Sequence, residues 1–335
     1  MGAILKQRIL WVDVLKGIAI MLVVTGHSAV ECGLNHWAYF IYSFHMPLFF
    51  LLSGFLFTPR PEKEYLRKSA RRLLLPFAAF VLLMAVPFFA SWIIHLDTVG
   101  AAGVIKPLKI MLLGGVMATA GWYTVVWFVT VLWLSTNLFN FIASRKLSLL
   151  LIVPLLLTGY LATYLTPDIP FHITIVPMAT AYIWLGFIIG QNIERLREYK
   201  RVGWIIGVLA IILTMWKASE LRIDMKHLDY GIPVISLALS IILSATFAMI
   251  AIELSKIKIL SSAIALLGEA SMVIMYLHLP LREVFLTPFR SHLVPDTMPW
   301  LYLVWALLIG LILPTGFYLI ALRFRPLRKL FLGKK

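Results

Sequence analysis

The stretch WVDVLKGIAIMLVVTGHS, residues 11–28, decides the fold class because it is a long apolar run. It also contains three ionisable side chains. His27 follows Lys16 by eleven residues and Asp13 by fourteen. At about 100° per residue, the three side chains fall within an arc of roughly 60° on one helix face. Charged and titratable groups are costly inside a membrane and usually mark a functional site there. We therefore expect a transmembrane helix that carries a polar stripe.

The composition extends this interpretation to all 335 residues. Hydrophobic residues make up 61% of the chain and charged residues 13%, whereas a soluble domain has about 25% charged residues. We predict an all-α, polytopic membrane helix bundle of about ten transmembrane helices, each of about 20 residues. Residues 1–335 are expected to form a single transmembrane domain with no separate soluble domain. The predicted spans cover 9–30, 37–58, 73–94, 123–142, 147–165, 172–190, 202–218, 231–253, 262–284 and 300–322.

Two further features of these segments bear on the topology. The segment 100–120 is apolar and rich in glycine but contains Lys106, Pro107 and Lys109, so we expect an interfacial or re-entrant segment there. Pro154 and Pro280 interrupt two of the predicted spans, and such kinks are tolerated in membrane helices.

The charge distribution predicts the orientation. The chain has 30 Lys and Arg residues and a formal net charge of +15, and most of these cations fall in alternate loops and at the two termini. This asymmetry predicts that both termini are cytoplasmic. The basic excess therefore indicates topology and contact with membrane lipids rather than binding to nucleic acid. The single cysteine, Cys32, excludes an internal disulfide and a cysteine-based metal site, and no metal is expected.

The polar stripe has two interpretations. Asp13 and Lys16 lie one turn apart and can pair, which lowers the cost of burying either charge. His27 is the side chain best suited to proton transfer near neutral pH. The alternative is an interfacial ion pair with His27 in a packing contact.

The second predicted span contains FHMPLFFLLSGFLF, residues 44–57. If the hairpin turns near residue 35, His45 lies at the same depth as His27 on an antiparallel neighbour. Ser53 and Gly54 permit close helix approach, although they are also typical of a simple packing notch.

Three other stretches carry candidate groups. RPEKEYLRKSARRLLLP, residues 60–76, is a basic helical stretch that could hold phosphate groups or act only as a positive-inside anchor. GWYTVVWF, residues 121–128, contains Trp127, which fits either an aromatic belt or a cavity wall. LGEASMVIMYLHLP, residues 267–280, contributes Glu269, Tyr276 and His278, and the latter two are expected near the depth of His27.

The order and spacing of six motifs resemble the acyltransferase-3 family of integral membrane acyltransferases over essentially the whole chain. The resemblance is strongest to its fucose 4-O-acetylase-like, polysaccharide O-acetyltransferase branch. The motifs are DVLKGIAIMLVVTGHS (13–28), SFHMPLFFLLSGFLF (43–57), RRLLLPF (71–77), VWFVTVLW (126–133), WLGFIIG (184–190) and ASMVIMYLHLPL (270–281).

The resemblance implies a multi-pass enzyme of the bacterial cytoplasmic membrane. It would move an acetyl or other short acyl group from cytoplasmic acetyl-CoA or another acyl-CoA to a hydroxyl of an extracytoplasmic glycan or lipid-linked sugar. The family's basic-x10-His motif falls on Lys16 and His27, with Lys in place of the commoner Arg, and its arginine pair falls on Arg71 and Arg72. Lys keeps the charge but loses the bidentate fork of Arg.

These considerations give three groups of site residues. The predicted catalytic residues are His27, Lys16 and Asp13. The predicted cofactor-binding residues, for acyl-CoA, are Arg67, Lys68, Arg71 and Arg72. The candidates for the acceptor or the thioester oxyanion are His45, Ser53, Trp127, Glu269, Tyr276 and His278.

Two other function classes fit the same residues. A transporter or flippase of a glycan or lipid intermediate would use the buried charges as a permeation path. A structural or sensory membrane subunit would use them only for packing.

Overall fold

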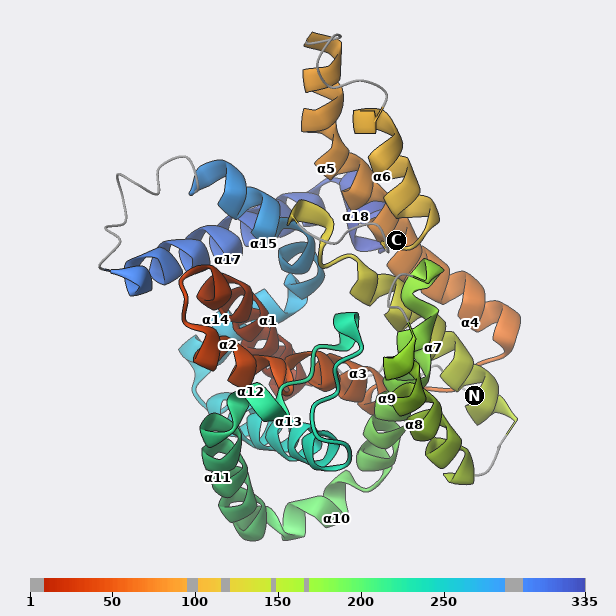
Figure 1. The fold of residues 1–335 in the computed structure, drawn as a ribbon, viewed down its shortest axis with the longest axis vertical. Coiled ribbons are helices and arrows are strands. Elements are labelled where there is room, and N and C mark those ends of the chain that lie inside the picture. The colour runs from red at the N-terminus through yellow and green to blue at the C-terminus, as the bar shows by residue number, and fades with distance from the viewer. Residues whose placement is uncertain are drawn as a thin grey trace.

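The computed structural model describes residues 9–94, 102–115, 121–145, 149–165, 169–286 and 298–334, which form a bundle of helices without a β-strand (Figure 1). The helices on the amino-terminal side are α1 (Leu10–Glu31), α2 (Asn35–Tyr42), α3 (His45–Phe55), α4 (Glu62–Ser69), the π-helix η1 (Ala70–Leu74), α5 (Leu75–Ile94), α6 (Ala102–Leu112), η2 (Gly121–Tyr123), α7 (Trp127–Ser144), η3 (Leu149–Leu151) and α8 (Ile152–Leu161). The remaining helices are η4 (Ala162–Tyr164), η5 (Pro170–Ile175), α9 (Val176–Gln191), α10 (Ile193–Glu198), α11 (Lys200–Trp216), α12 (Ala218–Leu221), η6 (Met225–His227), α13 (Ile235–Leu254), α14 (Lys258–Glu269), α15 (Ser271–Phe285), α17 (Pro299–Arg323) and α18 (Arg325–Leu332).

The all-α, polytopic class predicted from the sequence is confirmed. Within the described residues, seven helices are long and apolar enough to cross a membrane, and an eighth span results if α14 and α15 are taken together. Large apolar side chains also face outward where lipid would lie. On α11, for example, Ile205, Leu209 and Ile212 are each at least 60% exposed. Such surfaces are typical of a protein solvated by acyl chains rather than water.

The described residues contain seven or eight candidate spans, where the sequence predicts about ten over the whole chain. The predicted span 147–165 corresponds to short helices, of which α8 has 10 residues, and 202–218 corresponds to α11 with 17. At 1.5 Å per residue, α8 is roughly half as long as the hydrocarbon core is thick. The described part of 100–120 contains α6, which has 11 residues and is also too short to span alone.

The predicted kinked span 262–284 corresponds to two helices, α14 and α15, which meet at an angle of 75°. The break falls at Ala270, whereas Pro280 lies inside α15. A proline removes one backbone hydrogen bond but does not by itself fix the position of a bend. The bend redirects α15 toward α1 and α17, with which it packs.

Two close helix crossings hold the centre of the bundle. A Cβ atom on Gly268 of α14 would lie 1.9 Å from the Asp13 carbonyl oxygen of α1. On α3, a Cβ atom on Gly54 would lie 1.8 Å from the Ile183 carbonyl oxygen of α9, and Gly186 approaches Leu51 in the same way. Small residues permit this close approach of helix backbones. The α1–α14 and α3–α9 pairs therefore fix the positions of the two helices that carry His27 and His45.

Candidate active site

One cavity of about 720 Å³ lies between α1, α3, α4, α7 and α15. Its size falls in the range of about 300–1,000 Å³ that is typical of small-molecule sites. The middle of its wall is apolar and aromatic, with Phe49, Leu52, Phe128 and Leu132 among the lining residues. Polar side chains gather toward its two ends.

The basic end of the cavity is formed by Arg60, Lys68 and Arg72, together with Tyr65 and Ser69. Lys68 and Arg72 are four residues apart and so share one helix face. The chain adopts a π-helix over η1, which includes Arg72, and such local π turns are frequent at functional sites. Arg60 makes a 2.7 Å ion pair with Glu64, and the side chains of both are more than one third exposed. This end can hold an anionic group such as a phosphate.

Lys16 extends the positive charge along α1. It lines the cavity, and its Nζ atom lies 3.3 Å from the Asp13 carboxylate. The pair anticipated from the sequence is therefore formed. Asp13 itself is not among the lining residues, so its role here is to hold the Lys16 ammonium group.

The imidazole end of the cavity, which lies opposite the basic end, is formed by His27 of α1, His45 of α3 and Tyr42 of α2. Along α1, His27 is about 16 Å from Lys16 at 1.5 Å per residue. The Tyr42 ring lies 6.0 Å from the His27 ring and 5.1 Å from the His45 ring, between centroids. The two histidines anticipated at similar depth therefore face one cavity.

The ring orientation of His45 follows from a break between α2 and α3. The chain turns at Ser43 and Phe44, and the His45 Nδ1 atom then lies 3.0 Å from the Ile41 carbonyl oxygen. A carbonyl only accepts, so Nδ1 donates and the neutral ring carries its lone pair on Nε2. His45 therefore offers an acceptor to a ligand in the cavity.

His278 lies behind His27, outside the cavity wall. The two ring centroids are 5.5 Å apart, and the His278 Nδ1 atom lies 2.9 Å from the carbonyl oxygens of Ile274 and Met275. Its buried Nε2 atom has no hydrogen-bond partner in the described part of the chain. His278 can therefore act on His27, but it does not contact the cavity.

An ion-pair cluster one turn beyond His27 fixes the same two helices. Arg282 of α15 pairs with Glu31 of α1 and donates to the Ser28 hydroxyl at 3.2 Å. Tyr302 of α17 donates to Glu31 at 2.6 Å. The side chain of Arg282 is only 7% exposed, so loss of Glu31 would leave a buried cation without its ion-pair partner.

The loop of residues 222–231, between α12 and α13, completes the imidazole end. Figure 1 shows this teal segment crossing the middle of the molecule, and Asp224, Met225, Lys226 and His227 line the cavity. Lys226 donates to the Thr124 hydroxyl, before α7, at 2.6 Å. The Asp224 carboxylate lies in electrostatic range of Tyr42 and His45.

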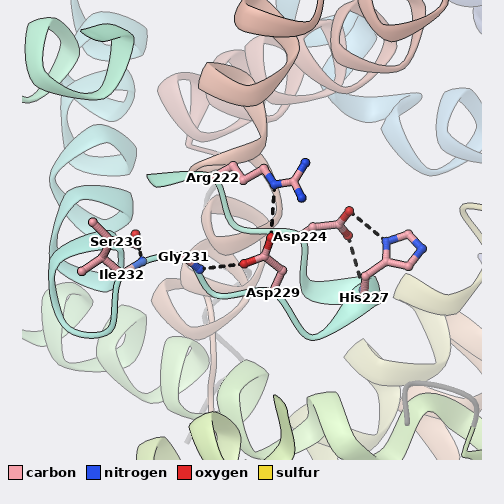
Figure 2. A network of polar contacts seen from close by, with 7 residues as sticks. All are labelled: Arg222, Asp224, His227, Asp229, Gly231, Ile232 and Ser236. Carbon is pink, nitrogen blue, oxygen red and sulfur yellow. Dashed lines mark hydrogen bonds and ion pairs between the residues drawn. The ribbon is translucent and has the colours of Figure 1, made fainter. Parts of the chain in front are cut away.

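Asp224 and His227 form a hydrogen-bonded pair in this loop, in which the His227 Nδ1 atom lies 2.8 Å from the Asp224 carboxylate (Figure 2). The hydrogen bond to Asp224 raises the pKa of the His227 imidazole, although partial burial opposes this. Burial would raise the pKa of the Asp224 carboxyl, but the hydrogen bonds and charge of His227, together with Arg222, hold that pKa below its usual value. Each partner therefore stabilises the charged form of the other.

Ser53 and Trp127 also reach the cavity. The Ser53 hydroxyl lines it and donates to the Phe49 carbonyl oxygen at 2.8 Å, while Gly54 beside it makes the α3–α9 crossing. Trp127 is 6% exposed and forms part of the wall. Ser53 therefore faces the cavity, and Gly54 provides the close helix packing anticipated for the SG pair.

Four other predicted site residues lie elsewhere. Tyr276 is fully buried and stacks on Phe80 at 4.5 Å, and Glu269 accepts a 3.0 Å hydrogen bond from Tyr318. Arg67 and Arg71 are not among the residues that line the cavity. A single cavity can be reached by only one face of the helical segment that carries them.

Sequence reasoning missed Tyr42 and Thr124, and it did not place the polar 222–231 loop at the cavity. The signal that pointed to the loop was the run RIDMKHLDY, residues 222–230, with five ionisable side chains of Arg, Asp, Lys and His in an apolar chain. That run identifies a polar loop but does not show that the loop enters the bundle.

The family model described as an acyltransferase domain matches residues 9–319. The chain belongs to the acyltransferase-3 family. Membership in this family identifies it as a membrane acyltransferase and decides against the transporter and the structural subunit that the residues alone left open. No curated protein and no solved structure matches the chain.

Proposed function

We propose that this acyltransferase-3 protein transfers an acetyl or other short acyl group from cytoplasmic acyl-CoA to a hydroxyl of an extracytoplasmic glycan or lipid-linked sugar. The observation that carries the proposal is one cavity with cations at one end and imidazoles at the other. Lys68 and Arg72 would bind the anionic phosphates of coenzyme A, and the narrow acyl-carrying arm would extend along the apolar wall toward His27.

In the reaction, His27 would act as a general base. Its imidazole would take the proton of the acceptor hydroxyl while the hydroxyl oxygen attacks the thioester carbonyl carbon. The carbon–sulfur bond then breaks, and the coenzyme A thiolate leaves and takes up a proton. His45 and Tyr42 face the same space, where His45 could accept from the acceptor hydroxyl and Tyr42 could donate to the developing oxyanion. A covalent acyl-imidazole on His27 would be an alternative route to the same products.

The orientation would place the basic end at the cytoplasmic face of the bacterial inner membrane and the imidazole end toward the outside. The placement of Lys and Arg in alternate loops supports this orientation. Acyl-CoA is confined to the cytoplasm, so a cavity with this polarity would let the acyl group cross without the cofactor crossing.

The proposal is tested with purified protein in lipid nanodiscs and acetyl-labelled coenzyme A. Release of free thiol and label on the protein are followed for wild type, His27→Ala and the control His36→Ala, which changes an exposed histidine of α2. We expect His27→Ala to lose about 10²–10⁴-fold in thiol release while it still binds acetyl-CoA, and His36→Ala to keep the wild-type rate.

Two results would decide against parts of this proposal. Wild-type thiol release in folded His27→Ala would remove His27 from the reaction. A wild-type protein that neither binds acetyl-CoA nor releases thiol would exclude acyl-CoA as the donor. Label trapped on wild type but absent from His27→Ala would favour the covalent route.

A further inference from the structure

The 222–231 loop contains two aspartates whose side chains do different work (Figure 2). The Asp229 carboxylate accepts from the Gly231 backbone N–H at 3.1 Å and from Arg222 Nε at 3.1 Å. It therefore stabilises the loop from within and does not line the cavity. The Asp224 carboxylate instead lines the cavity and holds His227.

The loop is fixed in place before any ligand arrives. The backbones of Asp224 and Asp229 exchange two hydrogen bonds, of 2.7 and 3.0 Å. Met225 and Leu228 are at most 3% exposed and pack in the same apolar cluster as Trp127. With Lys226 bonded to Thr124 on the far wall, the loop is held on both sides, which lowers the entropic cost of binding.

His227 is the part of the loop best placed to meet a ligand. Its side chain is 63% exposed, yet it lines the cavity. Because the ionised carboxylate only accepts, Nδ1 donates to Asp224, and Nε2 is left to a ligand. Because Asp224 fixes the orientation of the ring, Nε2 is presented to a ligand hydroxyl in one direction. If the pair served only to stabilise the short η6 turn, the Asp224 carboxylate would be needed, but an imidazole that faces the cavity would not.

The charges of the loop indicate the kind of ligand. Arg222 pairs with Asp229 and Asp224 pairs with His227, while the Lys226 ammonium group is bonded to Thr124. The loop therefore presents no cluster of unmatched cations that would select an anion. It offers a carboxylate and an imidazole, which together accept from and donate to hydroxyl groups.

We propose that Asp224 and His227, presented by the 222–231 loop, bind the acceptor, and that they hydrogen bond hydroxyl groups of a neutral polyol such as a sugar ring. This inference rests on the proposed function, because the acceptor must reach the acyl group beside His27. Asp224 and His227 are positioning residues, whereas His27 remains the group that takes the proton. Tyr42 and Trp127 supply aromatic surface on the adjoining walls of the same cavity.

The test measures thiol release from acetyl-CoA by the full-length protein in nanodiscs, with and without methyl glycosides of neutral hexoses and 6-deoxyhexoses. The variants are His227→Gln, Asp224→Asn and the control Asp229→Asn, which alters the same loop away from the cavity. We expect saturable stimulation of wild type by at least one glycoside. His227→Gln should raise the KM for that glycoside about tenfold and leave the KM for acetyl-CoA within about twofold. Asp224→Asn should follow His227→Gln, and Asp229→Asn should follow wild type.

The outcomes separate the two proposals. Wild-type protein that binds and slowly hydrolyses acetyl-CoA but responds to no glycoside overturns the neutral-polyol inference and leaves the acyl-CoA donor intact. An unchanged glycoside KM in His227→Gln overturns the role of the pair. Equal KM increases in His227→Gln and Asp229→Asn would show that the loop acts through its fold alone, which also overturns it. Wild-type protein without acetyl-CoA binding or thiol release would instead refute the proposed function.

Discussion

The two ends of the cavity are built in opposite ways. Arg60, Lys68 and Arg72 at the basic end come from one continuous segment of 13 residues, and their side chains are largely at the surface. The imidazole end combines α1, α2, α3 and the 222–231 loop, which are far apart in the sequence. An end that binds by charge can be built from one helical segment, whereas an end that positions reacting atoms needs several elements that fix one another.

The first prediction tests whether the basic end acts through specific side chains. Lys68→Ala/Arg72→Ala removes two cations that line the cavity, while Arg67→Ala/Arg71→Ala removes two cations that do not. We expect the first double variant to raise the KM for acyl-CoA about tenfold or more and the second to change it much less. KM at low and at physiological ionic strength is the measurement.

The two double variants change the net charge by the same amount, so each is the control for the other. Equal weakening in both double variants, lost at high salt, would mean that the basic end is only a diffuse positive field. The two ends would then differ further, because the basic end would not depend on individual side chains.

The second prediction tests the wall that the two ends share. Gly54→Ala would place a methyl group against the Ile183 carbonyl oxygen at the α3–α9 crossing, where overpacking costs about 1–3 kcal/mol. Thermal unfolding in detergent should show a lower midpoint, and both acyl-CoA binding and transfer should fall with the folded fraction.

Gly316→Ala is the matched control, because no atom lies within 4 Å of the added Cβ and the residue sits in α17. It should leave the midpoint unchanged or raise it slightly, since alanine favours a helix by about 0.5–1 kcal/mol over glycine. If Gly54→Ala and Gly316→Ala have the same unfolding midpoint, α3 and α9 can move apart enough to accommodate the added methyl group.

The third prediction concerns pH and the imidazole end alone. The Asp224 hydrogen bond raises the pKa of His227, so the charged pair is fully present below the ordinary histidine pKa. It is lost as pH rises through the raised pKa of His227, and at the acid end as pH falls through the lowered pKa of Asp224. Asp224→Asn should move the His227 titration to lower pH, which histidine NMR of labelled protein would follow.

The exposed His36 of α2 gives an internal reference in the same spectra. Its NMR signals should be the same in wild type and Asp224→Asn. A His227 midpoint that does not move would mean that the pair is not formed in solution, and the imidazole end would then be less rigid than described.

Part of the site could be predicted from the sequence because periodicity fixes which residues share a helix face. Asp13, Lys16 and His27 were placed on one stripe, and Lys16 and His27 do face one cavity. The same rule, applied further, separates Lys68 and Arg72 from Arg67 and Arg71. It also separates Tyr276 from His278, because two residues differ by about 200° around a helix.

Other features of the site could not be predicted from the periodicity of the sequence. The bend at Ala270 separates α14, which packs chiefly on α1, from α15, which packs chiefly on α17. The break at Ser43 and Phe44 turns His45 into the cavity in the same way. Glu269 lies on the far side of that bend, bonded to Tyr318 of α17.

The sequence by itself determined the membrane class, the family and the stripe that carries His27, because apolar length and side-chain spacing are properties of single segments. Only the tertiary structure decided which polar groups meet. The 222–231 loop enters the bundle because Met225 and Leu228 are buried among distant helices and Lys226 reaches Thr124. Such contacts depend on the packing of several segments at once, so no single stretch of sequence contains them.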